Sequence, residues 1–346
     1  MPASALSRRE RFALTVRGEE TDRPPVWIMR QAGRYMPQYM ALRERYSFRE
    51  LCLDPEASAA AALLPPELLG VDILIIFNDI LIPLEEMGLR VEFPGGGPEI
   101  MDPPRDEAAL GRFRAVAFED PPVAASIRLL RERTADEYPV LGFAGSPFTL
   151  LGYAVEGKMS RNAHEVRRLM LEQPELAHEM LRRLTDTVVS YLVAQAGAGG
   201  AAGVQIFESL GHILPAWEYG EFATVYTREV VRRFRAACPD TPVIVYSRGA
   251  AACLETMEST GADVLGVDWQ LPLAEARRRT TRPLQGNLDP MVMLAPDAVE
   301  DAFGRMLEGF DWRRGWIANL GHGITPQASV ESARRFVQCV RKLTGE

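Results

Sequence analysis

Short runs of apolar, often β-branched residues recur along this chain and are separated by longer segments with helical spacing. Such runs are typical of parallel strands that are buried on both faces, because helices cover both sides of their sheet. Runs of this kind occur at 25–29, 71–77, 139–145, 203–207, 242–247, 262–267, 283–287 and 315–320. Eight strands that alternate with helices predict an α/β fold, a single-domain (β/α)8 TIM-like barrel, and a doubly wound sheet is the alternative.

The segments between the runs carry apolar residues at steps of three and four, as amphipathic helices do. Residues 161–196 show this spacing, and Pro174 predicts a break into two helices. The glycine- and proline-rich stretch at 94–105 predicts an irregular excursion or a short β-hairpin after the second strand, in a position to cap the barrel. Because no tandem repeat or long linker interrupts the pattern, we predict one domain over residues 1–346.

The composition of the chain argues against some kinds of binding partner and cellular location. The net charge of −8 argues against a general nucleic-acid or membrane-surface binder, since such proteins present a basic face. We expect no secretion signal and no membrane span, because no apolar run is long enough for either. The four cysteines lack the paired spacing of a zinc or redox site, which favours reduced thiols and a cytoplasmic location.

In a barrel of this type the active site lies at the carboxyl ends of the strands, so the residues that follow the runs are candidates for function. Polar residues stand there after nearly every run: Arg30, Arg34, Asn78, Asp79, Ser146, Thr149, Tyr153, Glu208, Ser209, Ser247, Arg248, Asp268, Asn287, Asp289 and His322. Arg30 and Arg34 flank Gly33, and two guanidinium groups beside a glycine suit a ligand with carboxylates. The pattern predicts a polyanionic substrate.

The motif at 30–37, Arg-Gln-Ala-Gly-Arg-Tyr-Met-Pro, resembles the signature of the uroporphyrinogen decarboxylase family. Further matching segments lie at 77–81, 142–149, 205–209, 284–290 and 319–323. The resemblance implies a carboxy-lyase of porphyrin and heme biosynthesis that removes CO2 from the four acetate side chains of uroporphyrinogen III and gives coproporphyrinogen III. It also implies that no metal or organic cofactor takes part, and that the protein is a homodimer.

The resemblance implies catalytic roles for Asp79, Arg30 and Arg34. Asp79 matches a central aspartate that accepts hydrogen bonds from the pyrrole N–H groups, and its charge would stabilise a protonated pyrrole ring before CO2 leaves. The apolar residues that follow Asp79 argue against its alternative role as a helix cap. Arg30 and Arg34 match arginines that grip carboxylates, with a surface ion pair to an acid such as Glu44 as the alternative. The proton donor stays open, since arginine keeps its proton and a bound water or the substrate's own carboxyl suits that role better.

Further substrate contacts are implied by the same resemblance. They are Gln31, Ala32, Gly33, Phe48, Tyr153, Ser209 and His322. The structural alternatives are a half-buried aromatic residue for Tyr153, a helix N-cap for Ser209 and a loop imidazole for His322. Packing would explain Phe48 equally well. Asn78, next to Asp79, stands where the family commonly has serine.

Three other classes of protein compete with this interpretation. Related methyltransferases share the barrel and bind zinc through a His-x-Cys pair, but this chain contains no such pair and reads Tyr-Ser-Arg-Gly at 246–249. A non-catalytic tetrapyrrole-binding protein would keep the pocket and lose Asp79 or an arginine. A phosphate-sugar barrel enzyme would use the glycine-rich loops after the last two strands, although no lysine stands near a strand end to form a Schiff base.

Overall fold

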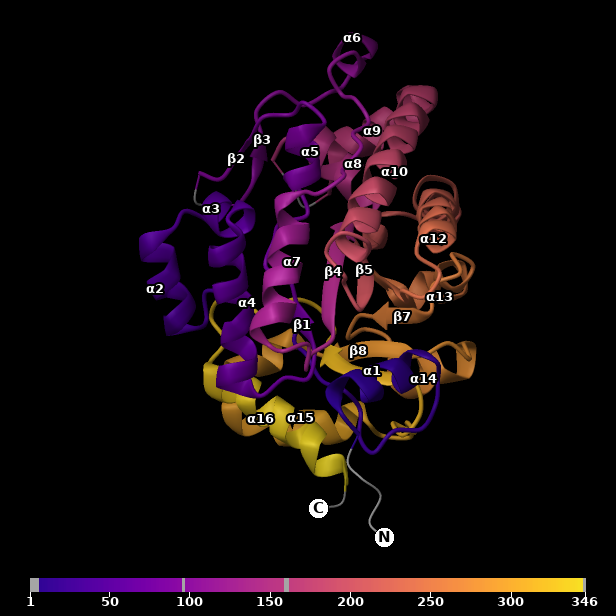
Figure 1. The fold of residues 1–346 in the computed structure, drawn as a ribbon. Helices are drawn as coiled ribbons and strands as arrows, with labels where there is room; N and C mark the ends of the chain where they lie inside the picture. The colour runs from indigo at the N-terminus through magenta and orange to yellow at the C-terminus, as the bar shows by residue number, and fades with distance from the viewer. Residues whose placement is uncertain (1–5, 95–96, 159–161, 345–346) are drawn as a thin grey trace.

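The computed structural model describes residues 6–94, 97–158 and 162–344, and a sheet of seven parallel strands surrounded by helices forms its centre (Figure 1). The strands, in their order in the sheet, are β1 (Leu74–Ile75), β4 (Val140–Gly145), β5 (Gly203–Glu208), β6 (Val243–Ser247), β7 (Val264–Val267), β8 (Leu284–Leu288) and β9 (Trp316–Leu320). Seven of the eight predicted strands are therefore confirmed, although β1 is shorter than the run at 71–77.

The remaining predicted strand, at 25–29, is not a regular strand, and the prediction for this run is wrong in that respect. The segment nevertheless contacts both edges of the sheet. Val26 forms a single parallel bridge with Ala318 of β9, and the Trp27 amide donates to the Ala318 carbonyl at 3.2 Å. On the other side the Asp72 amide, just before β1, donates to the Val26 carbonyl at 2.7 Å. The segment thus bridges the two edge strands.

Proline explains why the hydrogen-bond ladder is incomplete there. Pro24 and Pro25 have no amide hydrogen, so this stretch cannot bond to a neighbouring strand along its whole length. At the other end of the segment the Met29 amide donates to the side-chain Oδ1 of Asn319 at 2.8 Å. A side chain therefore replaces a ladder bond between main chains.

Helices cover the outside of the sheet and connect successive strands (Figure 1). They include α4 (Pro55–Leu69), α7 (Pro122–Arg133), α8 (Pro147–Glu156), α9 (His164–Glu172), α10 (Pro174–Ala196), α12 (Val225–Ala237), α13 (Ala250–Glu258), α15 (Val299–Met306) and α16 (Val330–Arg341). The others are α1 (Arg8–Val16), α2 (Pro37–Arg45), α3 (Phe48–Leu53), α5 (Ile82–Glu86), α6 (Glu107–Leu110), α11 (Ala216–Glu218) and α14 (Leu273–Arg279). The predicted break at Pro174 is confirmed, because α10 begins at this proline.

The predicted hairpin after the second run is present. β2 (Val91–Glu92) pairs antiparallel with β3 (Glu99–Ile100). Two glycines of the predicted turn, at positions 95 and 96, lie outside the described residues. The Ile100 amide donates to the carbonyl of Gly157, just beyond α8, at 2.7 Å. The hairpin and α5 lie together at the end of the molecule far from both termini (Figure 1).

Buried side chains show that the sheet is strongly curved. The Gln285 Nε2 of β8 donates to the Gln205 Oε1 of β5 at 3.0 Å, although two strands separate β5 and β8 in the sheet. In a flat sheet three strand spacings would hold these strands about 14 Å apart. The Trp27 indole also donates to Gln285 Oε1 at 3.0 Å. The inner face of the sheet therefore closes around these three side chains.

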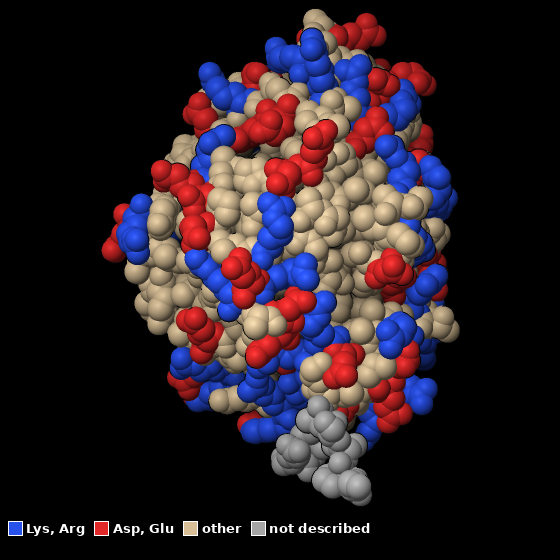
Figure 2. Space-filling model, in the orientation of Figure 1, with Lys and Arg blue, Asp and Glu red and all other residues tan. Residues whose placement is uncertain are grey.

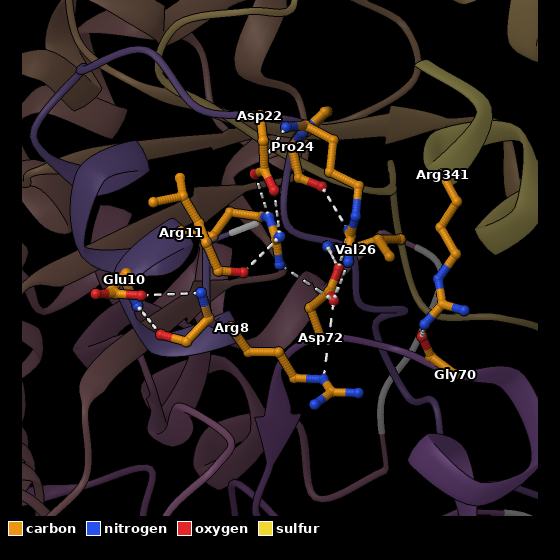
Figure 3. A network of polar contacts seen from close by, with 12 residues as sticks. Arg8, Glu10, Arg11, Asp22, Pro24, Val26, Gly70, Asp72 and Arg341 are labelled. Carbon is orange, nitrogen blue, oxygen red and sulfur yellow. Dashed lines mark hydrogen bonds and ion pairs between the residues drawn. The ribbon is translucent and has the colours of Figure 1, made fainter. Parts of the chain in front are cut away.

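A network of charged groups anchors the segment before 25–29 (Figure 3). The Asp72 carboxylate is fully buried and accepts two hydrogen bonds from the Arg23 guanidinium, at 2.5 and 2.7 Å, and one from the Val26 amide at 3.0 Å. Arg11 of α1 lies 3.8 Å from the same carboxylate and binds Asp22 with two further hydrogen bonds. Buried charges need such partners, so the network holds α1 and the 22–26 segment against the start of β1.

Candidate active site

Arg30 lies at a sharp turn of the main chain directly after the 25–29 segment. Its φ of +62° is in the left-handed region, which is unusual for a residue with a side chain. The adjoining Met29 carbonyl accepts a 2.9 Å hydrogen bond from the Ile324 amide in the loop after β9. A Cβ added at Gly323 would stand 2.4 Å from the Arg30 Cδ, so the arginine side chain occupies the space that this glycine leaves. The loop after β9 therefore determines where the Arg30 side chain lies.

Arg34 stands four residues further on and is exposed. Neither Arg30 nor Arg34 forms a side-chain hydrogen bond or an ion pair with any residue in the described part of the chain, and the alternative ion pair with Glu44 is not formed. Since most other arginines of the structure are bonded to carboxylates or carbonyls, these two guanidinium groups are available to an anionic ligand.

Asp79 is half-buried in the turn between β1 and α5. Its Oδ1 accepts a hydrogen bond from the Leu81 amide at 2.9 Å, within the turn before α5. Leu81, and not Asp79, occupies the N-cap of α5, so Asp79 is not a helix cap, as expected from the apolar residues that follow it. No described residue donates to its other oxygen. Burial raises the pKa of Asp79, while the Leu81 amide and the charge of Arg30 lower it. The carboxylate can thus hold its turn and still accept a hydrogen bond from a ligand.

Tyr153 comes from α8, whose first turn is set by Ser146. The Ser146 Oγ accepts from the Thr149 amide at 3.0 Å and Pro147 takes the first helical position, which together start the helix directly after β4. The Tyr153 hydroxyl has no hydrogen-bond partner among the described residues. Burial raises the pKa of Tyr153, and the charges of Arg30 and Asp79 also act on it, so the three predicted side chains lie within electrostatic reach of one another.

Ser209 follows β5 and lies next to a hydrogen-bond network centred on the buried carboxyl group of Glu208. Glu208 accepts hydrogen bonds from Ser146 Oγ at 2.5 Å, from Thr149 Oγ1 at 2.7 Å and from the Leu210 amide at 2.9 Å. The Ser209 amide donates to the same Thr149 hydroxyl at 2.8 Å. The alternative role of Ser209 as a helix cap is not realised, because Leu210 occupies the N-cap of the turn that follows. The Ser209 hydroxyl has no described partner.

His322 follows β9, and its ring stacks on Tyr246 with the ring planes 14° apart. Its Nδ1 lies 3.1 Å from the Tyr246 hydroxyl. Burial, and after it the neighbouring cations Arg30 and Arg248, lower the pKa of His322 to about 3. The imidazole is therefore neutral near pH 7, rather than charged as a simple pairing with a carboxylate would require.

The other residues of the first motif play mainly structural parts. The Gln31 side chain is buried and joins two main-chain segments, accepting from the Ile28 amide and donating to the Ile73 carbonyl, both at 3.2 Å. Both the oxygen and the nitrogen of its carboxamide are therefore already hydrogen-bonded to the main chain. Ala32 and Gly33 are half-buried in the turn, where a Cβ on Gly33 would lie 3.2 Å from the Arg30 carbonyl oxygen. The main chain of this turn, and not the glutamine side chain, is what a ligand could approach.

Phe48 begins α3 and belongs to an aromatic cluster. Its ring packs edge-on against Phe77, with centroids 6.0 Å apart, and lies 5.1 Å from the ring of Phe93 in the hairpin region. The Arg43 guanidinium lies 5.5 Å from the centre of the Phe48 ring, and the buried Arg43 Nε has no hydrogen-bond partner. Sequence reasoning did not single out Arg43. Arg43 stands nine residues after Arg34, and this spacing places it near Phe48 only once α2 is folded.

A separate hollow lies away from these groups. It has a volume of about 600 Å³ and is lined by Phe12 of α1, by Arg17 just after that helix, and by residues near the amino ends of the strands, among them Ala202 and Pro242. Its arginines already have partners, since Arg9 binds Asp136, Arg17 binds Glu19 and Arg235 binds Asp263. This hollow offers no unpaired cation and lacks the groups gathered at the strand ends.

The surface charge is consistent with a local anion site. On the face drawn in Figure 2, Lys and Arg side chains are interspersed with Asp and Glu, without a broad basic area. Within the described ranges no cluster of three or more His, Cys, Asp or Glu is placed to hold a metal ion. Nor does any described helix have the length and apolarity needed to cross a membrane.

Fold and site together define an α/β protein with arginines, a carboxyl group and an imidazole gathered at the ends of parallel strands. The family model "Uroporphyrinogen decarboxylase (URO-D)" matches residues 7–343. Curated uroporphyrinogen decarboxylases of Pelobacter propionicus and Myxococcus xanthus are each 42% identical to this chain; the matches cover 96% of it, and 98% and 96% of those proteins. The chain therefore belongs to the uroporphyrinogen decarboxylase family.

A solved structure supports the fold alone. A methyltransferase from Methanosarcina mazei superposes with a TM-score of 0.78 over 98% of this chain and 99% of the other, at 18% sequence identity. Such low identity carries information about architecture and none about substrate.

Proposed function

We propose that this protein decarboxylates the four acetate side chains of uroporphyrinogen III to methyl groups and so produces coproporphyrinogen III for porphyrin and heme biosynthesis. Membership of the family over residues 7–343 carries this proposal. The unpaired Arg30 and Arg34 supply what a substrate with eight carboxylates needs, and Asp79 supplies a hydrogen-bond acceptor at the same rim.

The proposed chemistry uses few protein groups. Arg30 and Arg34 hold the carboxylate of an acetate arm, and the free oxygen of Asp79 accepts hydrogen bonds from pyrrole N–H groups. Protonation of a pyrrole carbon makes the ring cationic. The bond to the carboxyl carbon then breaks, its electron pair neutralises the ring, and CO2 leaves. A proton added to the remaining CH2 gives the methyl group, and the ring releases the proton it gained.

Electrostatic stabilisation by Asp79 is the central feature of this proposal. A carboxylate in a partly buried site acts more strongly on a developing positive charge than one in water. Tyr153, Ser209 and the neutral His322 provide hydrogen-bonding groups without partners or with a single partner, which suits them to the other arms of the substrate. The turn at 31–33 adjoins Arg30, and the Phe48 ring, packed against Phe77 and Phe93, is suited to contact the apolar face of the macrocycle.

The proposal also covers the closure of the barrel, the number of domains, the oligomeric state and the cellular location. We infer that segment 25–29 takes the eighth position of a (β/α)8 barrel, since it hydrogen-bonds to both sheet edges, and that residues 1–346 form one domain. A homodimer is proposed from the resemblance to the family, with light scattering of the purified protein as its test. All four cysteines are free thiols, and three of them are buried. Free thiols persist in a reducing compartment, so we propose a cytoplasmic location.

The test is anaerobic incubation of chelator-treated protein with uroporphyrinogen III, followed by chromatography of the oxidised products. Stepwise appearance of porphyrins with seven, six, five and four carboxyl groups is the expected result, and it would also establish that no metal is needed. Absence of turnover together with tight binding of the tetrapyrrole would overturn the proposal in favour of a binding protein.

A further inference from the structure

Arg248 stands directly after β6, and its main chain is held on both sides. The Arg248 amide donates to the Glu208 carbonyl at the end of β5 at 2.9 Å, and the next amide, of Gly249, donates to the Asp268 Oδ2 after β7 at 2.6 Å. The turn is therefore rigidly attached to two neighbouring strand ends. The Arg248 side chain itself is half-buried and has no hydrogen bond or ion pair with any described residue.

The acid nearest to this arginine does not neutralise it. Asp268 is fully buried, and its two oxygens accept from the Gly249 and Gln270 amides at 2.6 and 3.3 Å. It forms no ion pair with Arg248. A buried carboxylate that is satisfied by amides has little reason to turn toward the guanidinium. Arg248 thus keeps its charge without a partner in a protein whose net charge is −8.

Two imidazoles share this side of the rim. A Cβ added at Gly249 would stand 2.9 Å from the His212 Cα, so the loops after β5 and β6 touch directly. Arg248 lowers the pKa of both His212 and His322, after the larger effect of burial on each. The groups here are therefore one permanent cation and two imidazoles that disfavour protonation. Asp268 also acts on Arg248 and His212, but both of its oxygens accept from main-chain amides, so the Arg248 guanidinium keeps no direct partner and can pair with an anionic ligand.

The position of Arg248 relative to Arg30 follows from the order of strands. β6 is the fourth of seven strands, three places from β1 and three from β9. Arg30 follows the segment that hydrogen-bonds to both of those edges. In a sheet curved enough for β5 and β8 to touch through their glutamines, the two arginines stand on opposite sides of the rim. A small monocarboxylate contacts one side, whereas a disc with carboxylates around its whole edge contacts both.

We propose that Arg248 is a specificity-determining residue that binds a carboxylate arm of the tetrapyrrole on the side opposite to the arm held by Arg30 and Arg34. This inference rests on the proposed function, and it deepens it by assigning a second anchoring point across the macrocycle. Arg248 contributes to capture and orientation of the substrate, not to the bond-breaking step.

The experiment compares Arg248→Gln and Arg248→Lys with the wild type. The matched control is Arg278→Gln, which removes an exposed arginine of α14 that has no described hydrogen bond or ion pair. Two readouts are taken: anaerobic kcat and KM for uroporphyrinogen III, and the Kd of uroporphyrin III, an oxidised octacarboxylate used as a non-reacting probe. Urea unfolding of each variant verifies that the fold is retained.

A lost charge-assisted hydrogen bond predicts that Arg248→Gln raises both KM and Kd by about tenfold to a hundredfold, with kcat within about threefold of the wild type. Arg248→Lys should recover part of the loss, and Arg278→Gln should change neither constant. Unchanged KM and Kd in a folded Arg248→Gln protein, with a wild type that turns over, overturn this inference and leave the proposed function standing. A wild type without turnover, whose uroporphyrin binding still depends on Arg248, would overturn the proposed function and support the anchoring point.

Discussion

Replacing Gly323 by alanine should displace Arg30 without disturbing the fold. The added Cβ would lie 2.4 Å from Arg30 Cδ and 2.9 Å from its Nε, whereas ordinary contacts begin at 3.4 Å. The φ of Gly323 is not in the left-handed region, so its backbone accepts alanine. Arg30 is exposed and flexible beyond its Cβ, and it must therefore be the group that moves, by about 1 Å.

A shift of this size in a group that grips the substrate predicts a fall in kcat/KM of about a hundredfold, since a misplacement of about 1 Å can cost that much. The free energy of unfolding should change by less than about 1 kcal/mol, because the contact is with a mobile side chain. Anaerobic kinetics with uroporphyrinogen III and urea unfolding measure the two quantities on the same preparation.

Gly304→Ala is the matched control. This glycine lies within α15, and no atom stands within 4 Å of an added Cβ. Alanine there should stabilise the helix by about 0.5–1 kcal/mol and leave kcat/KM unchanged. Wild-type kinetics for Gly323→Ala would refute the reasoning that the loop after β9 determines where Arg30 lies and that this position matters for catalysis.

Three further predictions concern charged or titrating groups. Asp79→Asn should keep the fold but lose most decarboxylation, because the amide cannot stabilise a cationic ring; near-normal product formation by chromatography would remove Asp79 from the mechanism. Asp72→Asn should lower the free energy of unfolding by about 3 kcal/mol, since it breaks a buried pair with Arg23, and an unchanged urea midpoint would show that the network of Figure 3 contributes little. The pKa of His322 is depressed to about 3, so the unfolded chain binds more protons at this residue between about pH 6.5 and pH 3. Stability contributed by the neutral imidazole is therefore complete above pH 6.5 and falls as the pH drops through that window. His322→Gln should flatten this part of the stability profile, and a profile identical to the wild type would contradict the depressed pKa.

Much of the fold could be predicted from local pattern. Apolar runs of five to seven residues identified the strands because a parallel sheet is buried on both faces, and seven of the eight runs contain strands in the structure. The break at Pro174 and the hairpin after the second run follow equally from local rules. The run at 25–29 failed as a regular strand for a local reason as well, since Pro24 and Pro25 lack amide hydrogens.

The site was predicted in part. Positions after strands pointed to Arg30, Asp79 and His322, and the resemblance to a family supplied their expected roles. What the pattern missed are relations between distant positions. The resemblance implies that Gln31 contacts the substrate, which stays a prediction, while the structure adds that the Gln31 side chain donates to the carbonyl of Ile73, 42 residues away in the sequence.

The sequence by itself determined seven of the eight strand positions, where the polar residues follow the strands, and that Arg30 and Arg34 stand beside Gly33 there, because these properties depend on neighbours within a few residues. Only the tertiary structure decided that Arg30 fills the space above Gly323, that His322 is neutral, and that Arg248 has no partner. Those properties depend on how deeply a side chain is buried and on the charges of groups that come from different strands. Both are set only when the curved sheet brings the strand ends together.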